Sequence, residues 1–189
     1  MAELSDQLSG ERLELRRWAP EHLAESLETI RASFDELHLW MSWAAEPPTI
    51  DSQRVVIEKS MRKFDENSRW EYGLFERDTA MCVGGAGLRR GDVPDELEIG
   101  YWVRTDRTGR GYACEATRVL TTAAFAAPLE IARVRISMDA ANHASAKVPH
   151  KLGFHFEGEM NRDLRTPAQT GKGILWTVTR EQWSTRRDD

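Results

Sequence analysis

The sequence has few cysteines, no long apolar run and no repeated or low-complexity segment. Its two cysteines, Cys82 and Cys114, form neither a metal-binding pattern nor a disulfide framework, so we expect a reducing, cytoplasmic location. No stretch approaches the roughly 20 apolar residues that cross a membrane, and the first residues lack the pattern of a secretory signal peptide. The sequence therefore predicts no membrane partner.

Basic residues are also fewer than acidic ones. Asp and Glu number 31 against 26 Lys and Arg, which gives a net charge of −5, and the basic residues are scattered along the chain. This balance argues against nucleic acid as the main partner and favours a cationic or amine-bearing one. A hydrophobic content of 40% and the lack of a linker-like segment predict one globular domain over residues 1–189.

Hydrophobic spacing predicts a mixed order of strands and helices. A strand at 11–18 alternates leucines with charged residues, Pro20 opens a helix over 20–36, and Asp51 is expected to cap a second helix. Three strands, a helix, a strand, a short helix and two closing strands follow at 70–76, 81–90, 96–103, 111–126, 132–140, 142–154, 154–160 and 173–179. Three consecutive strands before a crossover helix imply a mixed α/β sheet with helices on both faces.

The stretch RTDRTGRGYACEATRVL, residues 104–120, places Gly109 and Gly111 around Arg110 at the start of the predicted helix 111–126. Glycine lets the first helical amides approach phosphate oxygens, and these amides form the positive end of the helix dipole. The stretch therefore indicates either a phosphate cradle or a solvated turn that needs glycine for a positive φ. Strict G-x-G-x-x-G spacing and a Gly-Lys-Ser/Thr ending are absent, which argues against a Rossmann site and a Walker loop.

Four segments, in order, resemble the GNAT acyltransferase superfamily, and within it the RimJ/RimL branch of N-terminal and amine acetyltransferases. GRGYACEA matches the Q/R-x-x-G-x-G/A signature at Gly111 and Ala113, although Thr108 stands where Gln or Arg is usual. NHASAKVPHKLGFHFEG, which begins at Asn142, matches the pattern N-x-x-S…K-L-G-F…E-G. ELEIGYWV is similar to the strand before the glycine turn, and LWMSWA to the substrate-side loop.

The resemblance implies a mostly antiparallel sheet of about seven strands, in which the parallel strands 96–103 and 132–140 splay apart. The pantetheine arm of acyl-CoA would lie in that gap, and its diphosphate would sit on the glycine turn. Acetyl-CoA is the expected co-substrate, a succinyl or longer acyl donor stays open, and no metal is expected. The implied CoA contacts are Trp102, Val103, Gly109, Arg110, Gly111, Tyr112, Ala113 and Asn142. Asn142 has the alternative of simply capping its helix.

Acyl transfer from a thioester to an amine needs a neutral amine, an oxyanion donor and a proton for the leaving thiolate. Glu98 is the candidate base, with Glu96 as its substitute, and the alternative is a solvated or ion-paired strand glutamate. Many GNAT enzymes protonate the thiolate with a tyrosine where this chain has Pro149. The resemblance points instead to Ser145, which is otherwise an ordinary serine in a first helical turn. Cys114 is expected to pack rather than to act as a covalent nucleophile.

The acceptor side is predicted at an irregular stretch before two prolines. His38, Trp40, Met41 and Trp43 follow no regular period, so they indicate either a core cluster or an aromatic lip that binds the acceptor. The three later histidines run from a helix into a strand and predict no metal site.

The leading hypothesis is transfer of an acyl group, by default acetyl, from acyl-CoA to a primary amine by direct attack in a ternary complex. A ribosomal or other protein N-terminus, a small-molecule amine and a peptide antibiotic stay open as acceptors. The alternative is a non-catalytic acyl-CoA-binding sensor or interaction module. A homodimer through the closing strands is expected by analogy with the family.

Overall fold

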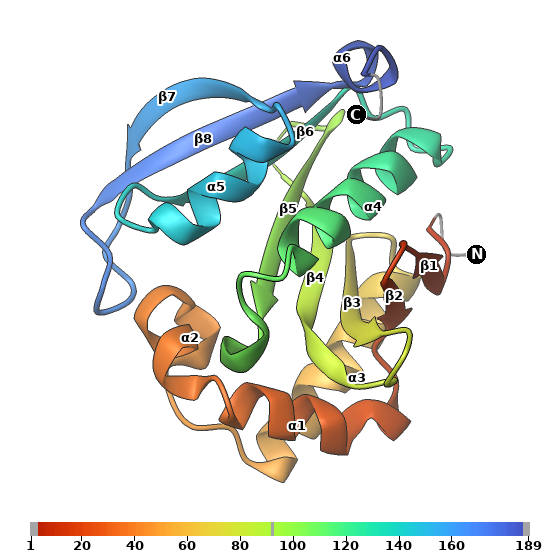
Figure 1. Cartoon of the computed structure of the whole chain (residues 1–189), viewed down its shortest axis with the longest axis vertical. Coiled ribbons are helices and arrows are strands. Elements are labelled where there is room, and N and C mark those ends of the chain that lie inside the picture. The colour runs from red at the N-terminus through yellow and green to blue at the C-terminus, as the bar shows by residue number, and fades with distance from the viewer. Residues whose placement is uncertain (1–3, 92, 187–189) are drawn as a thin grey trace.

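One mixed β-sheet runs through the protein. The computed structural model describes residues 4–91 and 93–186, and in these residues eight strands lie in the order β1-β2-β3-β4-β5-β6-β8-β7 (Figure 1). Their bounds are Gln7–Ser9, Leu13–Arg17, Arg69–Glu76, Cys82–Arg90, Glu96–Val103, Arg133–Asp139, His155–Asn161 and Lys172–Thr179, for β1 to β8 in turn. Only β5 and β6 are parallel neighbours within the described part of the chain. The predicted α/β class is confirmed, with β1 as a strand too short to leave a pattern.

Helices lie on both faces of this sheet. They are α1 Leu23–Arg31, α2 Phe34–Trp40, α3 Ile50–Asp65, α4 Tyr112–Ala126, α5 His143–Lys151 and α6 Arg180–Ser184. In Figure 1, α4 and α5 lie in front of the central strands, whereas α1 and α3 pack against β4 and β3 from the other side. The face under α4 holds the largest buried cluster, to which β5 contributes Leu97 and Ile99 and α4 contributes Leu120. Burying each such side chain contributes about 1.5–3 kcal/mol.

The helix expected at 20–36 is broken in two. At Ser33 the backbone leaves the helical region, with φ −125° and ψ 11°. The buried Ser33 Oγ accepts a hydrogen bond from the Thr105 amide at 3.0 Å, so the break fixes the junction of α1 and α2 to the segment after β5. The second half, α2, continues to Trp40, into the stretch that was expected to be irregular.

Thr49, not Asp51, caps α3. The Thr49 hydroxyl accepts from the Ser52 amide at 3.1 Å, and the Ser52 hydroxyl accepts from the Thr49 amide at 2.9 Å, which is a reciprocal capping box. Asp51 lies one residue inside the helix and pairs with Arg54. The prediction placed the cap two residues late because Thr, Asp and Ser are all good capping residues here.

The parallel strands β5 and β6 pair over only three positions, from Glu96↔Arg133 to Glu98↔Arg135. On its other side β5 stays paired with β4 as far as Val103↔Gly84. The last five residues of β5 therefore have a partner strand on one edge only, which agrees with the predicted splay.

Candidate active site

The glycine turn, residues Gly109–Gly111, joins the end of β5 to α4 through a short 3₁₀ turn at Thr105–Arg107. Both glycines have positive φ, +76° and +85°, in the region that favours glycine. No side chain caps α4 at Gly111, whereas Thr49 caps α3 and Asn142 caps α5. The first amides of α4 therefore keep their donors available at the positive end of the helix.

The Tyr112 hydroxyl is already engaged by a buried acceptor. It donates to Glu76 at 2.6 Å, and both residues are buried. The hydrogen bond from Tyr112 holds the pKa of Glu76 below its ordinary value, and the charges of Arg107 and Arg110 act in the same direction. Tyr112 can therefore serve a phosphate only through its backbone amide, while the two arginines add positive charge nearby.

Glu98 lies on β5 where the splay begins, but its carboxylate is ion-paired. Oε1 accepts from Arg89 and from Ser137, each at 2.9 Å, and Oε2 accepts from Arg135 at 2.8 Å. Burial opposes ionisation of Glu98, yet the hydrogen bonds and charges of the two arginines outweigh it and hold the pKa below its ordinary value. These contacts favour the ion-paired interpretation of Glu98 over the role of base.

Glu96, the substitute base, is paired in the same way. Its two oxygens accept from Arg133 at 2.6 Å and from Arg135 at 3.2 Å. Arg135 thus joins Glu96 to Glu98, and the resulting charge ladder closes β5 onto β6 just before the strands separate.

Ser145 lies in the first turn of α5, across the splay from Tyr101 of β5. The Tyr101 hydroxyl donates to the Ser145 carbonyl at 2.8 Å and accepts from the Ser145 hydroxyl at 3.1 Å. Burial raises the pKa of Tyr101, so its phenol stays protonated in this contact. Asn142 caps α5, because its Oδ1 accepts from the Ser145 amide at 3.1 Å. The capping alternative is confirmed, and a contact of Asn142 with CoA stays a prediction.

Two of the expected acceptor residues, Met41 and Trp43, lie near Trp102 at the end of β5. Met41 and Trp102 pack against a second small core of Ile30, Leu37 and Ala44. Trp43 is 49% exposed and its ring centroid lies 5.9 Å from that of Trp102.

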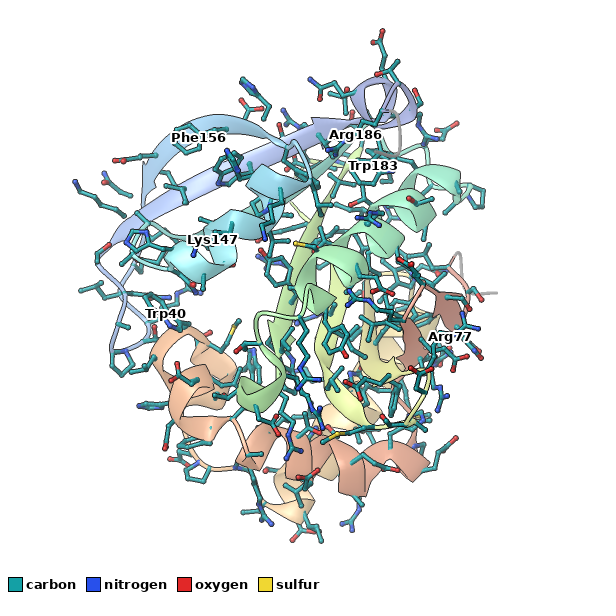
Figure 2. The ribbon with its side chains drawn as sticks, viewed as in Figure 1. Trp40, Arg77, Lys147, Phe156, Trp183 and Arg186 are labelled. Atoms are coloured by element: carbon teal, nitrogen blue, oxygen red, sulfur yellow. The ribbon has the colours of Figure 1, made fainter. Side chains whose placement is uncertain are left out.

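Trp40 lies at the end of α2, facing the β7–β8 connection (Figure 2). That connection is tied to α2, because the Ala168 amide donates to the Leu39 carbonyl at 3.2 Å. The stretch is thus partly core and partly an exposed aromatic edge beside Trp102.

His38 is oriented by one hydrogen bond. Its Nδ1 lies 3.0 Å from the Ala44 carbonyl oxygen, which can only accept, so Nδ1 carries a proton in this contact. His38 is half-buried between the ring of Phe34 and this carbonyl. Its Nε2 is therefore the ring nitrogen that this contact leaves available on the expected acceptor side.

Two further features limit the chemistry of the site. Burial raises the pKa of the Cys114 thiol, which disfavours a reactive thiolate. In the described residues no group of three or more His, Cys, Asp and Glu side chains could hold a metal ion.

None of the helices formed by residues 4–91 and 93–186 is long and apolar enough to cross a membrane.

Sequence patterns did not point to Arg12 and Glu115, which lie beside the glycine turn. The Arg12 Nε donates to Glu115 at 3.1 Å, and its Nη1 donates to the Arg110 carbonyl at 2.9 Å. Arg12 and Glu115 are 103 positions apart, so no local spacing could have joined them.

Comparisons with known proteins agree with this geometry. Residues 12–155 match the family model described as an acetyltransferase (GNAT) domain, so the chain belongs to the GNAT acetyltransferase family. It is an acyl-CoA-dependent acetyltransferase, and its relatives support the RimJ/RimL-like branch.

The particular relatives extend over nearly the whole chain. The chain is 29% identical over 176 residues to a Bacillus subtilis (strain 168) protein named "Putative ribosomal N-acetyltransferase YdaF", covering 92% of this chain and 94% of the relative. A solved structure of a probable acetyltransferase has 26% identity and a TM-score of 0.85, covering 94% and 98% of the two chains. RimL, a ribosomal L7/L12 α-N-protein acetyltransferase solved with coenzyme A, has 18% identity and a TM-score of 0.83 over 92% and 97%, and shows the shared fold.

Proposed function

We propose that this chain transfers an acetyl group from acetyl-CoA to the α-amine of a protein N-terminus, by direct attack of the amine on the thioester. Family membership supports the acyl-CoA chemistry. The observation that carries the proposal is the separation of β5 from β6 directly beside the uncapped start of α4. Unpaired strand donors and helix-end donors of this kind suit a pantetheine arm and a diphosphate.

The coenzyme contacts are proposed from backbone donors. β4 pairs with Trp102 and Val103 on one edge only, which leaves their other edge for the pantetheine arm. The amides of residues 109–113 would hold the diphosphate, with the Arg110 side chain exposed beside them. The Asn142 side-chain nitrogen has no hydrogen-bond partner within the described residues, so it can donate to the arm while Oδ1 caps α5.

The acceptor is proposed to enter past the aromatic edge of His38, Trp40, Met41 and Trp43. The relative YdaF is named as a ribosomal N-acetyltransferase and RimL as an acetyltransferase of ribosomal L7/L12, which supports a ribosomal protein N-terminus as acceptor. We accordingly propose a cytoplasmic enzyme, with residues 1–189 as one domain. A homodimer is proposed by family analogy alone.

Proton removal from the amine has two candidate bases. Glu98 can act only where the substrate displaces Arg89 or Arg135, because both of its oxygens already accept hydrogen bonds from these arginines. His38 needs no such displacement, because its hydrogen bond to the Ala44 carbonyl uses Nδ1 and not Nε2. An N-terminal α-amine has a pKa near 8, so a modest base suffices at neutral pH.

The leaving thiolate is proposed to accept a hydrogen bond from the Ser145 hydroxyl. The Ser145 hydroxyl donates to Tyr101 in the free protein, so it must rotate toward the sulfur to hydrogen-bond it. Pro149, which is buried inside α5, has no proton to give. A serine hydroxyl is a weak acid, so its proposed role is to hydrogen-bond the thiolate, and the proton that completes the CoA thiol comes from solvent, which balances the proton that the amine gives up.

The test is release of CoA thiol from acetyl-CoA with a peptide panel. Peptides with free ribosomal-protein N-termini should be turned over, and the same peptides with blocked N-termini and one internal lysine should not. Small amines complete the panel. Binding of CoA by calorimetry without turnover of any acceptor would contradict the proposal and favour the sensor alternative.

A further inference from the structure

We infer that Arg12 is a phosphate-binding residue of the acyl-CoA site, positioned at the glycine turn by Glu115, an inference that rests on the proposed function. Arg12 lies in the tight connection between β1 and β2, far from the glycine turn in sequence but next to it in the fold. Its guanidinium would add a positively charged donor to the neutral backbone amides of the turn.

Glu115 holds the backbone of this connection against α4. Its Oε1 accepts from the amides of Arg12 and Leu13, at 2.6 and 2.9 Å, and its Oε2 accepts from the Arg12 Nε at 3.1 Å. Glu115 is only 5% exposed and lies in the first turn of α4. Three hydrogen bonds to one buried carboxylate fix both the main chain and the side-chain direction of Arg12.

The far end of the Arg12 side chain reaches the glycine turn. Nη1 donates to the Arg110 carbonyl at 2.9 Å, and Nη2 lies 3.2 Å from the position that a Cβ on Gly111 would occupy. The guanidinium carbon also lies 5.2 Å from the ring centroid of Tyr112, the first residue of α4. Arg12 therefore contacts the residues on both sides of the uncapped helix start.

One nitrogen of Arg12 is left for a ligand. Nε and Nη1 are used by Glu115 and Arg110, but Nη2 has no hydrogen-bond partner among the described residues, and the side chain is 51% exposed. Arginine presents fixed N–H groups that match phosphate oxygens, and its charge strengthens each hydrogen bond. Held in this way, Nη2 can bind a phosphate oxygen on the turn with little further loss of side-chain freedom.

Arg12 also balances a negative charge that lies close to the glycine turn. The Glu115 carboxylate lies in the first turn of α4, where it would repel a bound diphosphate. The ion pair with Arg12 compensates that charge, and Arg107 and Arg110, whose charges also act on the buried Glu76, add positive charge at the turn. Without the Arg12 guanidinium, the buried Glu115 carboxylate would keep only its two backbone donors and no counter-charge beside the proposed diphosphate site.

The experiment compares Arg12→Gln and Arg12→Lys with the unsubstituted chain, using acetyl-CoA and acetyl-pantetheine, which has the same thioester but no phosphate. We expect Arg12→Gln to raise the KM for acetyl-CoA about tenfold to a hundredfold with little change in kcat, as loss of a charge-assisted hydrogen bond predicts. The KM of Arg12→Lys for acetyl-CoA should lie between that of Arg12→Gln and that of the unsubstituted chain. Activity with acetyl-pantetheine should be nearly unchanged in both variants.

Arg77→Gln is the matched control, because Arg77 is an exposed arginine whose Nη1 donates to the Gly10 carbonyl in the same β1–β2 connection (Figure 2). It removes one positive charge close by and should leave the KM for acetyl-CoA within about twofold. An unchanged KM in Arg12→Gln, or equal losses with both substrates in both Arg12 variants, would overturn the inference. Failure of the unsubstituted chain to bind CoA at all would instead overturn the proposed function.

Discussion

Side chains around the splay are each held by partners from distant parts of the chain. Glu98 is held by Arg89 from β4 and Arg135 from β6, and Tyr101 is held by Ser145 from α5. Such fixed side chains suit a site that must align two substrates, because little reorganisation is needed when they bind.

Replacing Glu98 by Gln should destabilise the protein in a pH-dependent way. Gln leaves Arg89 and Arg135 without their shared anion, so we expect the free energy of unfolding at pH 7 to fall by about 1–3 kcal/mol. The pKa of Glu98 is lowered from 4.5 in the folded protein, so its contribution is present above that pH and is lost as the pH falls through the folded value. Urea unfolding from pH 7 to pH 3 measures this difference.

Asp51→Asn is the control for this series, because Asp51 forms an exposed pair with Arg54 and should contribute less than about 0.5 kcal/mol at any of these pH values. The account of Glu98 is wrong if the difference between Glu98→Gln and the unsubstituted chain stays constant down to pH 3.

The sequence identified the chemistry of single residues better than their partners. Glu98 was expected to be a base or else a solvated or ion-paired strand glutamate, but the partners in its ion pairs depend on the register of β4, β5 and β6, which spacing along one strand does not reveal. The Arg12–Glu115 pair depends on how β1–β2 docks on α4. Contacts of this kind arise from tertiary packing alone.

At the scale of elements, α4 has no side-chain cap among the described residues, as is also true of α1 and α2, whereas α3 and α5 are capped. Gly111 takes the position of the cap with positive φ, and its Cα faces the Arg12 guanidinium. The N-terminal end of α4 therefore presents amide donors and positive charge next to the glycine turn.

Gly111→Glu should abolish CoA binding while the protein stays folded. The new side chain would put negative charge at the diphosphate position, and the positive φ would cost about 1–2 kcal/mol of stability. Calorimetry with CoA and circular dichroism measure the two effects separately. Gly91→Glu serves as control, because Gly91 lies at the end of β4 in open space. Unchanged CoA affinity in Gly111→Glu would refute the phosphate role of the turn.

The hydroxyl of Tyr101 should help to hold α5 to β5. Tyr101→Phe removes two hydrogen bonds to Ser145, so we expect a loss of about 1–2 kcal/mol in the free energy of unfolding. Ser145→Ala removes only one of them and should cost less. In a double-mutant cycle the two changes should couple by at least about 0.5 kcal/mol, and additive effects would contradict a direct contact.

Elements with a clear hydrophobic periodicity were predicted well, whereas element boundaries that depend on tertiary contacts were not. β5 and α4 lie where alternation and helical spacing placed them, and Gly153 follows α5 with φ +59° as a helix-ending glycine should. The break at Ser33 was missed because its cause is the Thr105 amide, 72 positions away. β1 was missed because three residues carry no readable alternation.

At the scale of the whole molecule, the sheet consists of two antiparallel parts joined through the short parallel contact of β5 and β6. The charge ladder of Glu96, Glu98 and Arg135 holds the parts together at one end of this contact, and the Tyr101–Ser145 pair spans it further along β5. Beyond Glu98, β5 has no pairs with β6 and continues to Trp102 and Val103, so the proposed acyl-CoA and acceptor sites share the unpaired end of β5.

The most direct test of this account is a crystal structure of the chain with bound CoA. We predict the diphosphate within hydrogen-bond distance of the amides of residues 109–113, and the pantetheine arm along the free edge of Trp102 and Val103. A structure in which CoA binds elsewhere, or in which side chains fill the space between β5 and β6 while CoA is bound, would contradict the account.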